Sequence, residues 1–516
     1  MIALAALSGP VPKAGVVVVA GLLAVALLHP EIRARAGAML GALLLAPTLL
    51  LADIWHSQQL SVVHRHPLAA ASGALVGLVA VALLARVLVR RPSLLAPLVI
   101  IALPFRIPIK AGGTTSNLLV PLYLVVGAAV LAFIVPSLWR RAARSLARDE
   151  EDGAETPAGW LERLLALYVV IYAIQAIYSS DFEKALQQMV FFYVPFALMF
   201  CLLRTLQWTK ALLRQCVVLV GALALLFVAI GFVEYATKTL LLNPKLIAQN
   251  GVHTYFAINS VFFDPDIFGR FLALVMILFA AVLIYDRRQR DQLLTVGVLA
   301  LLWAGLVLTL SRSSLAALLV GLGILGAMRW RARPILLAAV AVVVIGIAAV
   351  VISPKTFGLN QGLNGASSGR AGLVSGGLQL FGDRPLWGYG SGSFCTEYKR
   401  INPATSATLC ASHTIAVTIA AEQGLIGELP YLALVIAAGL LLVRGARRDP
   451  ARAAVAAAFL ALVFHTLLYA DFLEDPVTWT LLGVGTALAY SSRAPGRERV
   501  TSGGAAQHGE AAVVAA

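Results

Sequence analysis

Charged side chains are scarce in this chain, and their scarcity excludes a soluble domain. Only 13% of the 516 residues are charged, 60% are hydrophobic, and the mean hydropathy is +0.87. Apolar runs of roughly 15 to 26 residues recur, and each can cross or nearly cross a hydrocarbon layer of about 30 Å. The runs lack the period-two alternation of a transmembrane β-barrel. The sequence therefore predicts an all-α polytopic membrane protein with about 12–15 transmembrane helices and one large extracytoplasmic loop containing short helices.

Acidic residues are the scarcest of the charged ones, with 25 Asp and Glu against 40 Lys and Arg, and the net charge is +15. In a soluble protein this balance would suggest nucleic-acid binding. Here the basic residues cluster in short turns between apolar runs, which is how membrane topology is encoded. We therefore expect no nucleic-acid partner. A cleavable signal peptide is also missing, so the first apolar run is expected to stay in the membrane.

Fifteen apolar spans can be threaded through the chain so that every strongly basic short loop falls on one side. This agreement predicts an extracytoplasmic N-terminus and a cytoplasmic C-terminus. The predicted spans are 14–28, 37–52, 67–89, 93–109, 117–138, 160–178, 185–205, 211–236, 264–285, 292–310, 313–328, 334–353, 425–443, 453–470 and 476–492.

Composition divides the chain into six parts. The charged stretch with the acidic run 149–152 is typical of a linker, and the Gly- and Ala-rich end of the chain is typical of a disordered tail. The predicted parts are N-terminal membrane helices that could form an accessory bundle (1–139), a cytoplasmic linker (140–159), core transmembrane helices (160–353), an extracytoplasmic catalytic loop (354–424), C-terminal transmembrane helices (425–492) and a disordered cytoplasmic tail (493–516).

Cysteine is also rare, and the four cysteines divide by position. Cys201 and Cys216 lie in or near spans, where they act as small apolar residues. Cys395 and Cys410 both fall in the large outer loop, where an oxidising compartment permits a disulfide. We expect that disulfide, with two free thiols as the alternative.

Arg312 interrupts two apolar runs at the outer membrane boundary. The span before it reaches that boundary and the span after it is short, so the guanidinium lies at or just below the headgroups. An arginine at such a depth tends to be functional, although it can also simply extend to the interface. The flanking Ser311, Ser313 and Ser314 favour an anion site, because hydroxyls can share a phosphate.

Arg370 stands at the start of a second short helix, which the sequence predicts to end near Phe381. An arginine in the first turn opposes the helix dipole unless an anion lies there. A helix N-terminus and a guanidinium together make a phosphate site. The alternative is a solvated loop arginine.

His413 stands where the large loop re-enters an apolar helix. A neutral imidazole beside an outer-face cavity is a suitable general base, and a structural interfacial histidine is the alternative. Glu422 lies about half a turn away from the face of His413, which makes it a poor partner. We therefore predict that Arg312, Arg370 and His413 meet at the outer membrane face.

A Gly-rich turn lies between these residues, from Asp383 to Gly392. Its backbone N–H groups could cradle an anion, or it could be a turn that lets the loop pack on the membrane. Tyr389 and Trp387 suit a sugar-stacking or an interface role, and Tyr389 is a candidate accessory residue.

Further outer-side residues give weaker signals. Asp264 and Asp266 fit ordinary helix capping, whereas Arg270 lies about one turn inside a span and is a candidate accessory residue. Asp471 is a second one, because it could orient an acceptor or the histidine, with capping as the alternative. The nearest approach to a metal cluster has spacing that fits no zinc pattern, so we expect no metal site. Its members are Asp53, His56, His64 and His66.

These motifs, taken in order, resemble the O-antigen ligase/polymerase superfamily. The similarity covers roughly residues 160–490 and is strongest over 309–430. The family usually has an asparagine after the loop histidine, where this chain has Thr414, and its usual count of about twelve spans is exceeded here by the first five. The motifs that carry the resemblance are Ser311-Arg-Ser-Ser, Gly369-Arg370, Gly382-Asp-Arg-Pro-Leu-Trp-Gly-Tyr-Gly-Ser-Gly-Ser-Phe394, Ser412-His-Thr and Glu422-Gln-Gly-Leu-Ile-Gly427.

The resemblance implies a membrane glycosyltransferase of the GT-C type in the bacterial cytoplasmic membrane, acting at the extracytoplasmic face. The donor would be an undecaprenyl-diphosphate-linked glycan, and no nucleotide sugar, metal or cofactor would be used. Arg312 and Arg370 would hold the diphosphate, which gains charge as it leaves. His413 would deprotonate or orient the acceptor hydroxyl, giving direct displacement with inversion.

The expected partners are this donor, a glycan, lipid or protein acceptor, and membrane lipids. Two other functions stay open: a polysaccharide polymerase that uses the same donor class, and a transporter or flippase of a lipid-linked sugar. A transporter would need polar residues along a path through the spans, whereas the polar residues gather at the outer boundary.

Overall fold

The computed structural model describes residues 10–55, 60, 64–111, 114–139, 158–241, 256–285, 288–330, 333, 370–403, 412–469 and 471–491. In these parts the chain is almost entirely helical. The elements are α1 (Pro10–Leu28), α2 (Ile32–Asp53), α4 (Pro67–Arg90), η2 (Pro92–Leu94), α5 (Leu95–Ala102), β1 (Ile107–Ala111), β2 (Thr114–Leu118), α6 (Val120–Trp139), α8 (Trp160–Ala176), α9 (Phe182–Gln188), the π-helix η3 (Met189–Tyr193), α10 (Val194–Thr205), α11 (Lys210–Thr237), α13 (Pro265–Tyr285), α14 (Gln289–Thr309), α15 (Arg312–Arg329), α18 (Arg370–Asp383), α19 (Phe394–Ile401), α20 (Ile415–Val443), η6 (Ala446–Arg448), α21 (Pro450–Thr466) and α22 (Pro476–Ser491).

The predicted fold class is confirmed: the chain is an all-α polytopic membrane protein. Ten helices in the described parts are long and apolar enough to cross a membrane. Most predicted spans match a helix to within a few residues, and the span at 334–353 lies outside the described residues.

The predicted span 93–109 is wrong. Its helix ends at Ala102, and the chain then forms the antiparallel hairpin β1–β2, in which Ile107 pairs with Leu118. Pro104 and Pro108 explain the difference, because a proline disfavours helical conformation in the residue before it and removes a backbone donor.

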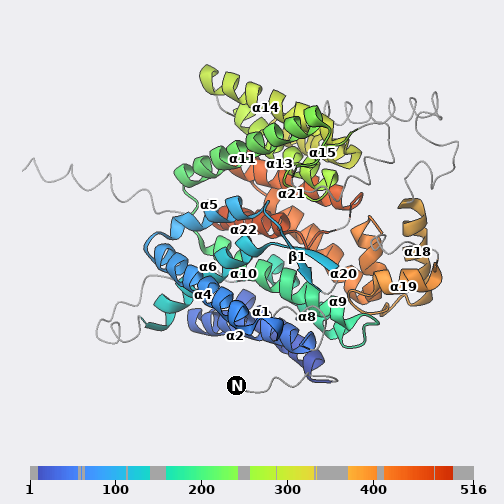
Figure 1. Ribbon diagram of the computed structural model, residues 1–516. Coiled ribbons are helices and arrows are strands. Elements are labelled where there is room, and N and C mark those ends of the chain that lie inside the picture. Colours follow the sequence, from blue (N-terminus) through green and yellow to red (C-terminus); the bar gives the residue numbers. More distant parts are fainter. Residues whose placement is uncertain are drawn as a thin grey trace, which may run out of the picture.

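The helices form one bundle (Figure 1). The early helices pack directly on the later ones, since α1 contacts α8 and α10, and α6 contacts α10. Helices α13, α15 and α21 pack against one another, with α14 beside α13. Figure 1 shows α14 and α4 at opposite sides of the bundle and α18 and α19 together at one edge, beside α20 and α9. The helices contributed by 1–139 are therefore part of the same packed bundle.

Helix ends that the charge pattern assigns to one side do meet. At the predicted cytoplasmic end, Glu162 of α8 is fully buried and pairs with Arg204 of α10 at 3.0 Å. Tyr490 near the end of α22 donates to the same carboxylate at 3.1 Å. At the opposite end, the starts of α13 and α15 meet the loop between α21 and α22. The predicted alternation of the spans across the membrane requires the helix ends to be grouped in this way.

Helix α20 begins at Ile415 rather than at 425, because it is two helical pieces joined at a kink. Gly424 has φ of 61° at the break. A Cβ there would lie 2.4 Å from the carbonyl oxygen of Leu386, because the Gly-rich loop passes directly across the kink. Only glycine satisfies both the backbone angle and the close approach.

The Gly-rich loop is hydrogen-bonded to α20 next to this kink. The carboxylate of Glu422 accepts from the backbone N–H groups of Gly392 at 2.8 Å and of Phe394 at 3.0 Å. The anion at these donors is therefore one of the protein's own side chains, and the loop packs on α20. Glu422 fixes the large loop onto the membrane helices.

Candidate active site

Asp266 connects the elements of the candidate site. It lies in the first turn of α13, where Asp264 already caps the helix by accepting from the Asp266 N–H at 2.7 Å. One carboxylate oxygen of Asp266 accepts from Ser311 at 2.5 Å and Ser313 at 3.2 Å. The other lies 3.3 Å from the Arg370 guanidinium. The starts of α13, α15 and α18 thus share one carboxylate.

Arg370 is the first residue of α18, and this helix has the extent that the sequence predicts. Its guanidinium also donates to the Leu468 carbonyl at 3.2 Å, and its side chain remains 38% exposed. The anion that the helix start requires is Asp266 in this structure. Enough of the guanidinium is exposed to meet a second anion.

Arg312 is the first residue of α15, and its side chain is exposed. No ion pair of Arg312 occurs within the described residues. The serines beside it face inward and bond Asp266 and His465, the latter at 3.3 Å from Ser313. Their hydroxyls are thus used inside the protein, and Ser311 also caps the helix by accepting from the Ser314 N–H at 3.2 Å. The exposed guanidinium of Arg312 is the group left for an external anion.

Close packing of α13 on α15 allows this arrangement. A Cβ at Gly269 would lie 2.8 Å from the Ser314 hydroxyl and 3.0 Å from the Cβ of Ser311. A larger residue at 269 would therefore separate the serines from Asp266.

His413 lies immediately before α20 in the left-handed backbone region, with φ of 57°. Its ring meets the edge of Tyr469, with the ring centroids 5.9 Å apart. Burial lowers the pKa of His413 below its ordinary value, the charge of Arg370 lowers it further, and Asp266 and Asp471 partly offset this. The imidazole is therefore kept neutral, in the form that can accept a proton.

Asp471, in the loop between α21 and α22, also has positive φ, at 90°. Strained backbone of this kind persists where the surrounding structure fixes it, often at functional sites. Nearby, the Tyr469 hydroxyl donates to Asp264 at 3.3 Å. Burial and the neighbouring Asp266 raise the pKa of Asp264 to about 6.

Of the three predicted residues, Arg370 and His413 both interact with Asp266, and Arg312 lies next to the serines that bond Asp266. Arg270 lies one turn into α13, as predicted, and is nearly fully buried. It pairs with Asp475 at 2.8 Å and lies 6.0 Å from the Tyr469 ring centre. Arg270 is therefore already neutralised from within.

Tyr389 requires a correction. It is buried, with Arg384 lying 4.4 Å and Arg400 5.6 Å from its ring centre. Burial between two guanidinium groups argues against sugar stacking by Tyr389. Trp387 of the same loop is 59% exposed and is the accessible aromatic residue.

The remaining predictions concern the cysteines and the potential metal ligands, and the structure describes only some of these residues. Cys395 is disulfide-bonded, and Cys201 and Cys216 are free. Cys410 lies outside the described residues, so its pairing with Cys395 stays a prediction. His56 lies outside them too, and the described residues contain no group of three or more potential metal ligands.

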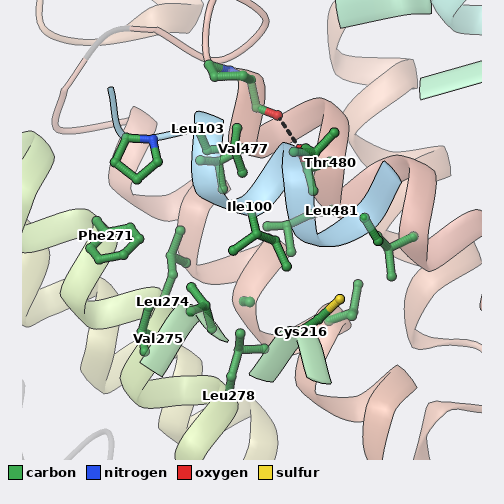
Figure 2. Close-up of a pocket in the computed structure, with 18 of the residues that line it drawn as sticks. Ile100, Leu103, Cys216, Phe271, Leu274, Val275, Leu278, Val477, Thr480 and Leu481 are labelled. Carbon is green, nitrogen blue, oxygen red and sulfur yellow. Dashed lines mark hydrogen bonds between the residues drawn. The ribbon is translucent and has the colours of Figure 1, made fainter. Parts of the chain in front are cut away.

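An apolar cavity of about 230 Å³ opens beside Arg270 (Figure 2). Figure 2 shows Ile100, Phe271, Leu274 and Leu481 around one common space. The walls come from α5, α11, α13, α21 and α22. Polar side chains include Arg106, Arg270 and Asp475. The cavity therefore offers a lipid-compatible space with two guanidinium groups in its wall.

A second cavity, of about 360 Å³, is polar. Asp471 lines it, and so does Ile415, two residues after His413. The polar and aromatic residues that line this cavity are Tyr168, Tyr172, Asp181, Lys184, Gln188, Tyr193, Thr418, Glu422, Gln423, Tyr431, Asp471, Phe472 and Glu474.

One short loop separates the two cavities. Residues 471–474 line the polar cavity, and residues 475–477 line the apolar one. The loop is held in place by Trp479, whose indole N–H donates to the Leu473 carbonyl at 2.8 Å.

Sequence reasoning missed several members of the site. The sequence assigns Asp266 only to helix capping, and the motifs that predict the site do not include Lys184, His465 or Glu474. A carboxylate two residues inside a helix start and a histidine at the end of an apolar span are signals that could have directed attention to Asp266 and His465.

Comparison with known proteins adds one finding. Residues 297–432 match the family model described as O-Antigen ligase. The match includes Arg312, Arg370 and His413 and ends before Asp471. No curated protein matches the chain.

Proposed function

We propose, from the match of residues 297–432 to the O-Antigen ligase family model, that the chain is a member of the O-antigen ligase/polymerase superfamily and that it transfers a glycan from an undecaprenyl-diphosphate-linked donor to an acceptor hydroxyl. The transfer is ligase-like, uses no metal, and inverts the configuration at the transferred sugar. The protein is a GT-C type glycosyltransferase of the bacterial inner membrane, and its active site faces the extracytoplasmic side.

The two ends of such a donor need different environments, and the site offers both. The apolar cavity suits a segment of the polyprenyl chain, since its wall is almost entirely aliphatic and aromatic. The diphosphate would lie between the exposed guanidinium groups of Arg312 and Arg370 at two helix starts. Arg270, whose charge is already paired with Asp475, would act as an accessory residue by holding the 471–477 loop in place.

The bond changes follow from these positions. His413 takes the proton of the acceptor hydroxyl, whose oxygen forms a bond to the anomeric carbon of the donor sugar. The bond between that carbon and the phosphate oxygen breaks, and polyprenyl diphosphate leaves with both electrons. Arg312 and Arg370 stabilise the charge that develops on this leaving group. The negative charge of Asp471 stabilises the protonated form of His413 that results from this proton transfer.

The observation that carries the proposal is the junction at Asp266. It brings Arg370 and the start of α15 to one carboxylate, which also acts on His413. The two cavities meet at the 471–477 loop, whose Asp471 acts on the same imidazole. With an added acceptor, purified protein should transfer the glycan of a fluorescent polyprenyl-diphosphate glycan to the acceptor hydroxyl and release polyprenyl diphosphate. Absence of transfer by folded wild-type protein, with donors and acceptors from its own host, would refute the proposal.

Two other functions give different results in the same preparation. A polymerase would produce a ladder of products that each grow by one repeat, whereas a ligase adds its glycan once. A flippase would move labelled donor across a liposome membrane without breaking a bond. The polar side chains of the site gather at helix starts and loops, which favours chemistry at one membrane face over passage through the spans.

A further inference from the structure

The polar cavity has no assigned occupant in the proposed reaction. Its volume, about 360 Å³, falls at the lower end of the range of about 300–1,000 Å³ for small-molecule sites. Asp471 belongs to its wall and also acts electrostatically on His413. The cavity therefore shares the wall residue Asp471 with the surroundings of the base.

The cavity wall suits a hydroxyl-rich molecule. Tyr172 donates to the amide oxygen of Gln188, and the Gln188 amide donates to Glu474, which forms a connected polar chain along the wall. A second polar contact joins Gln423 and Tyr168, since the Gln423 amide donates to the Tyr168 hydroxyl at 3.1 Å. Aromatic faces and paired donors and acceptors are what a sugar ring requires.

The charge of the wall disfavours an anionic occupant. Asp181, Asp471, Glu422 and Glu474 contribute carboxyl groups, and Lys184 is the single cation in the lining. Burial raises the pKa of Glu474 and the neighbouring Asp471 raises it further, so the carboxyl group is biased towards the protonated acid, which can donate a hydrogen bond. The carboxylate of a uronic acid entering this space would meet the carboxylates of Asp181 and Asp471 and would be repelled.

We propose that the polar cavity binds the sugar of the acceptor that carries the attacking hydroxyl, and that it takes an uncharged sugar in preference to a uronic acid. The inference deepens the proposed function and rests on it. It makes the acceptor a glycan, whose reactive end lies on the opposite side of the 471–477 loop from the donor lipid.

Direct binding tests the cavity without requiring turnover. Full-length protein in lipid nanodiscs is probed by saturation-transfer NMR with methyl glycosides of glucose, galactose, mannose, rhamnose and N-acetylglucosamine, and with methyl glucuronide. At least one neutral glycoside should receive saturation, and the glucuronide should receive several-fold less. Loss of the signal is expected in Ile419→Trp, which fills the cavity from α20. Leu432→Trp, on the exposed face of the same helix, is the matched control and should keep it.

Kinetics separate this inference from the proposed function. In Ile419→Trp and Glu474→Ala, the KM for the delipidated repeat-unit oligosaccharide as acceptor should rise at least tenfold, with the donor KM changed less than twofold. Glu474→Gln, which keeps a hydrogen-bonding group, should recover most of the affinity. An unchanged acceptor KM in both variants, or preferred binding of the glucuronide, would overturn the inference while the transfer activity stands. Inactive but folded wild-type protein would overturn the proposed function, and the NMR result would then still decide whether the cavity binds neutral sugars.

Discussion

The two cavities beside the 471–477 loop differ in almost every chemical respect although they are neighbours. The apolar cavity is lined by aliphatic and aromatic side chains from α5, α11, α13, α21 and α22, whereas the polar cavity contains four tyrosines and four carboxyl groups. Along the loop the lining changes between two consecutive residues, because Glu474 lines the polar cavity and Asp475 lines the apolar cavity. A reaction that joins a lipid-borne group to a hydroxyl-rich acceptor needs this separation.

The 471–477 loop and the side chains that contact it carry charges. Arg270 and Asp475 close the apolar side as a buried pair, and Asp471 and Glu474 face the polar side. Near the junction lie Arg370 and His413, the residues that the proposed reaction uses. Substitutions at the junction should therefore affect the reaction as a whole, whereas substitutions inside one cavity should affect one substrate.

The largest effect is expected at the junction. Replacing His413 with alanine should lower the rate of glycan transfer about 10²- to 10⁴-fold, the usual contribution of a general base. The rate is measured on purified protein at saturating donor and acceptor. Leu75→Ala, at a position 62% exposed on α4, should retain full activity, and a fully active His413→Ala protein would remove His413 as the base.

The next largest effect is expected at the buried ion pair between Arg270 and Asp475. Arg270→Met leaves the Asp475 carboxylate buried without its partner and should lower the free energy of unfolding by about 3–5 kcal/mol. The double variant Arg270→Met/Asp475→Asn removes both charges and should recover much of this loss. Thermal unfolding in detergent measures both variants. Equal destabilisation of the single and double variants would show that the charges are not coupled.

Filling the apolar cavity should affect the donor alone. Leu274→Trp places a larger ring in the space shown in Figure 2 and should raise the donor KM roughly tenfold, which corresponds to about 1.4 kcal/mol of lost binding free energy. The acceptor KM should stay within twofold. Leu301→Trp, at an exposed position of α14, controls for the substitution itself. A rise in the acceptor KM instead would contradict the assignment of the lipid to this cavity.

Much of the fold could be predicted because membrane helices leave a strong local signal. The apolar runs and the basic loops were sufficient to place most spans and to group helix ends by side. The exception at 93–109 shows the limit: its apolar content suits a span, but Pro104 and Pro108 prevent the helix from continuing. Local backbone chemistry overrode hydropathy there.

The site was harder to predict, because its contacts join residues far apart in the chain. The motifs identified Arg312, Arg370 and His413, but nothing near Asp266 in sequence indicates that Ser311 and Arg370 bond it. Glu422 was set aside as a poor partner for His413, and its actual partners are N–H groups of the Gly-rich loop about 30 residues earlier. Tyr389 looked accessible as a loop aromatic, and only the packing of Arg384 and Arg400 shows that it is covered.

The smallest effect concerns the acid side of the pH profile, and it links the polar cavity to the base. Transfer requires neutral His413, so the rate should fall as the pH drops through the pKa of His413, which lies below its ordinary value of 6.5. The negative charge of Asp471 favours the protonated imidazole and raises that pKa. Asp471→Asn removes this charge, so the acid limb of kcat should move to lower pH. The limb is recorded at saturating acceptor, because Asp471 also lines the acceptor cavity and its loss can change KM. His413→Gln should abolish the limb in the residual activity, and a shift of the Asp471→Asn limb to higher pH would mean that Asp471 does not act on the imidazole as a charge.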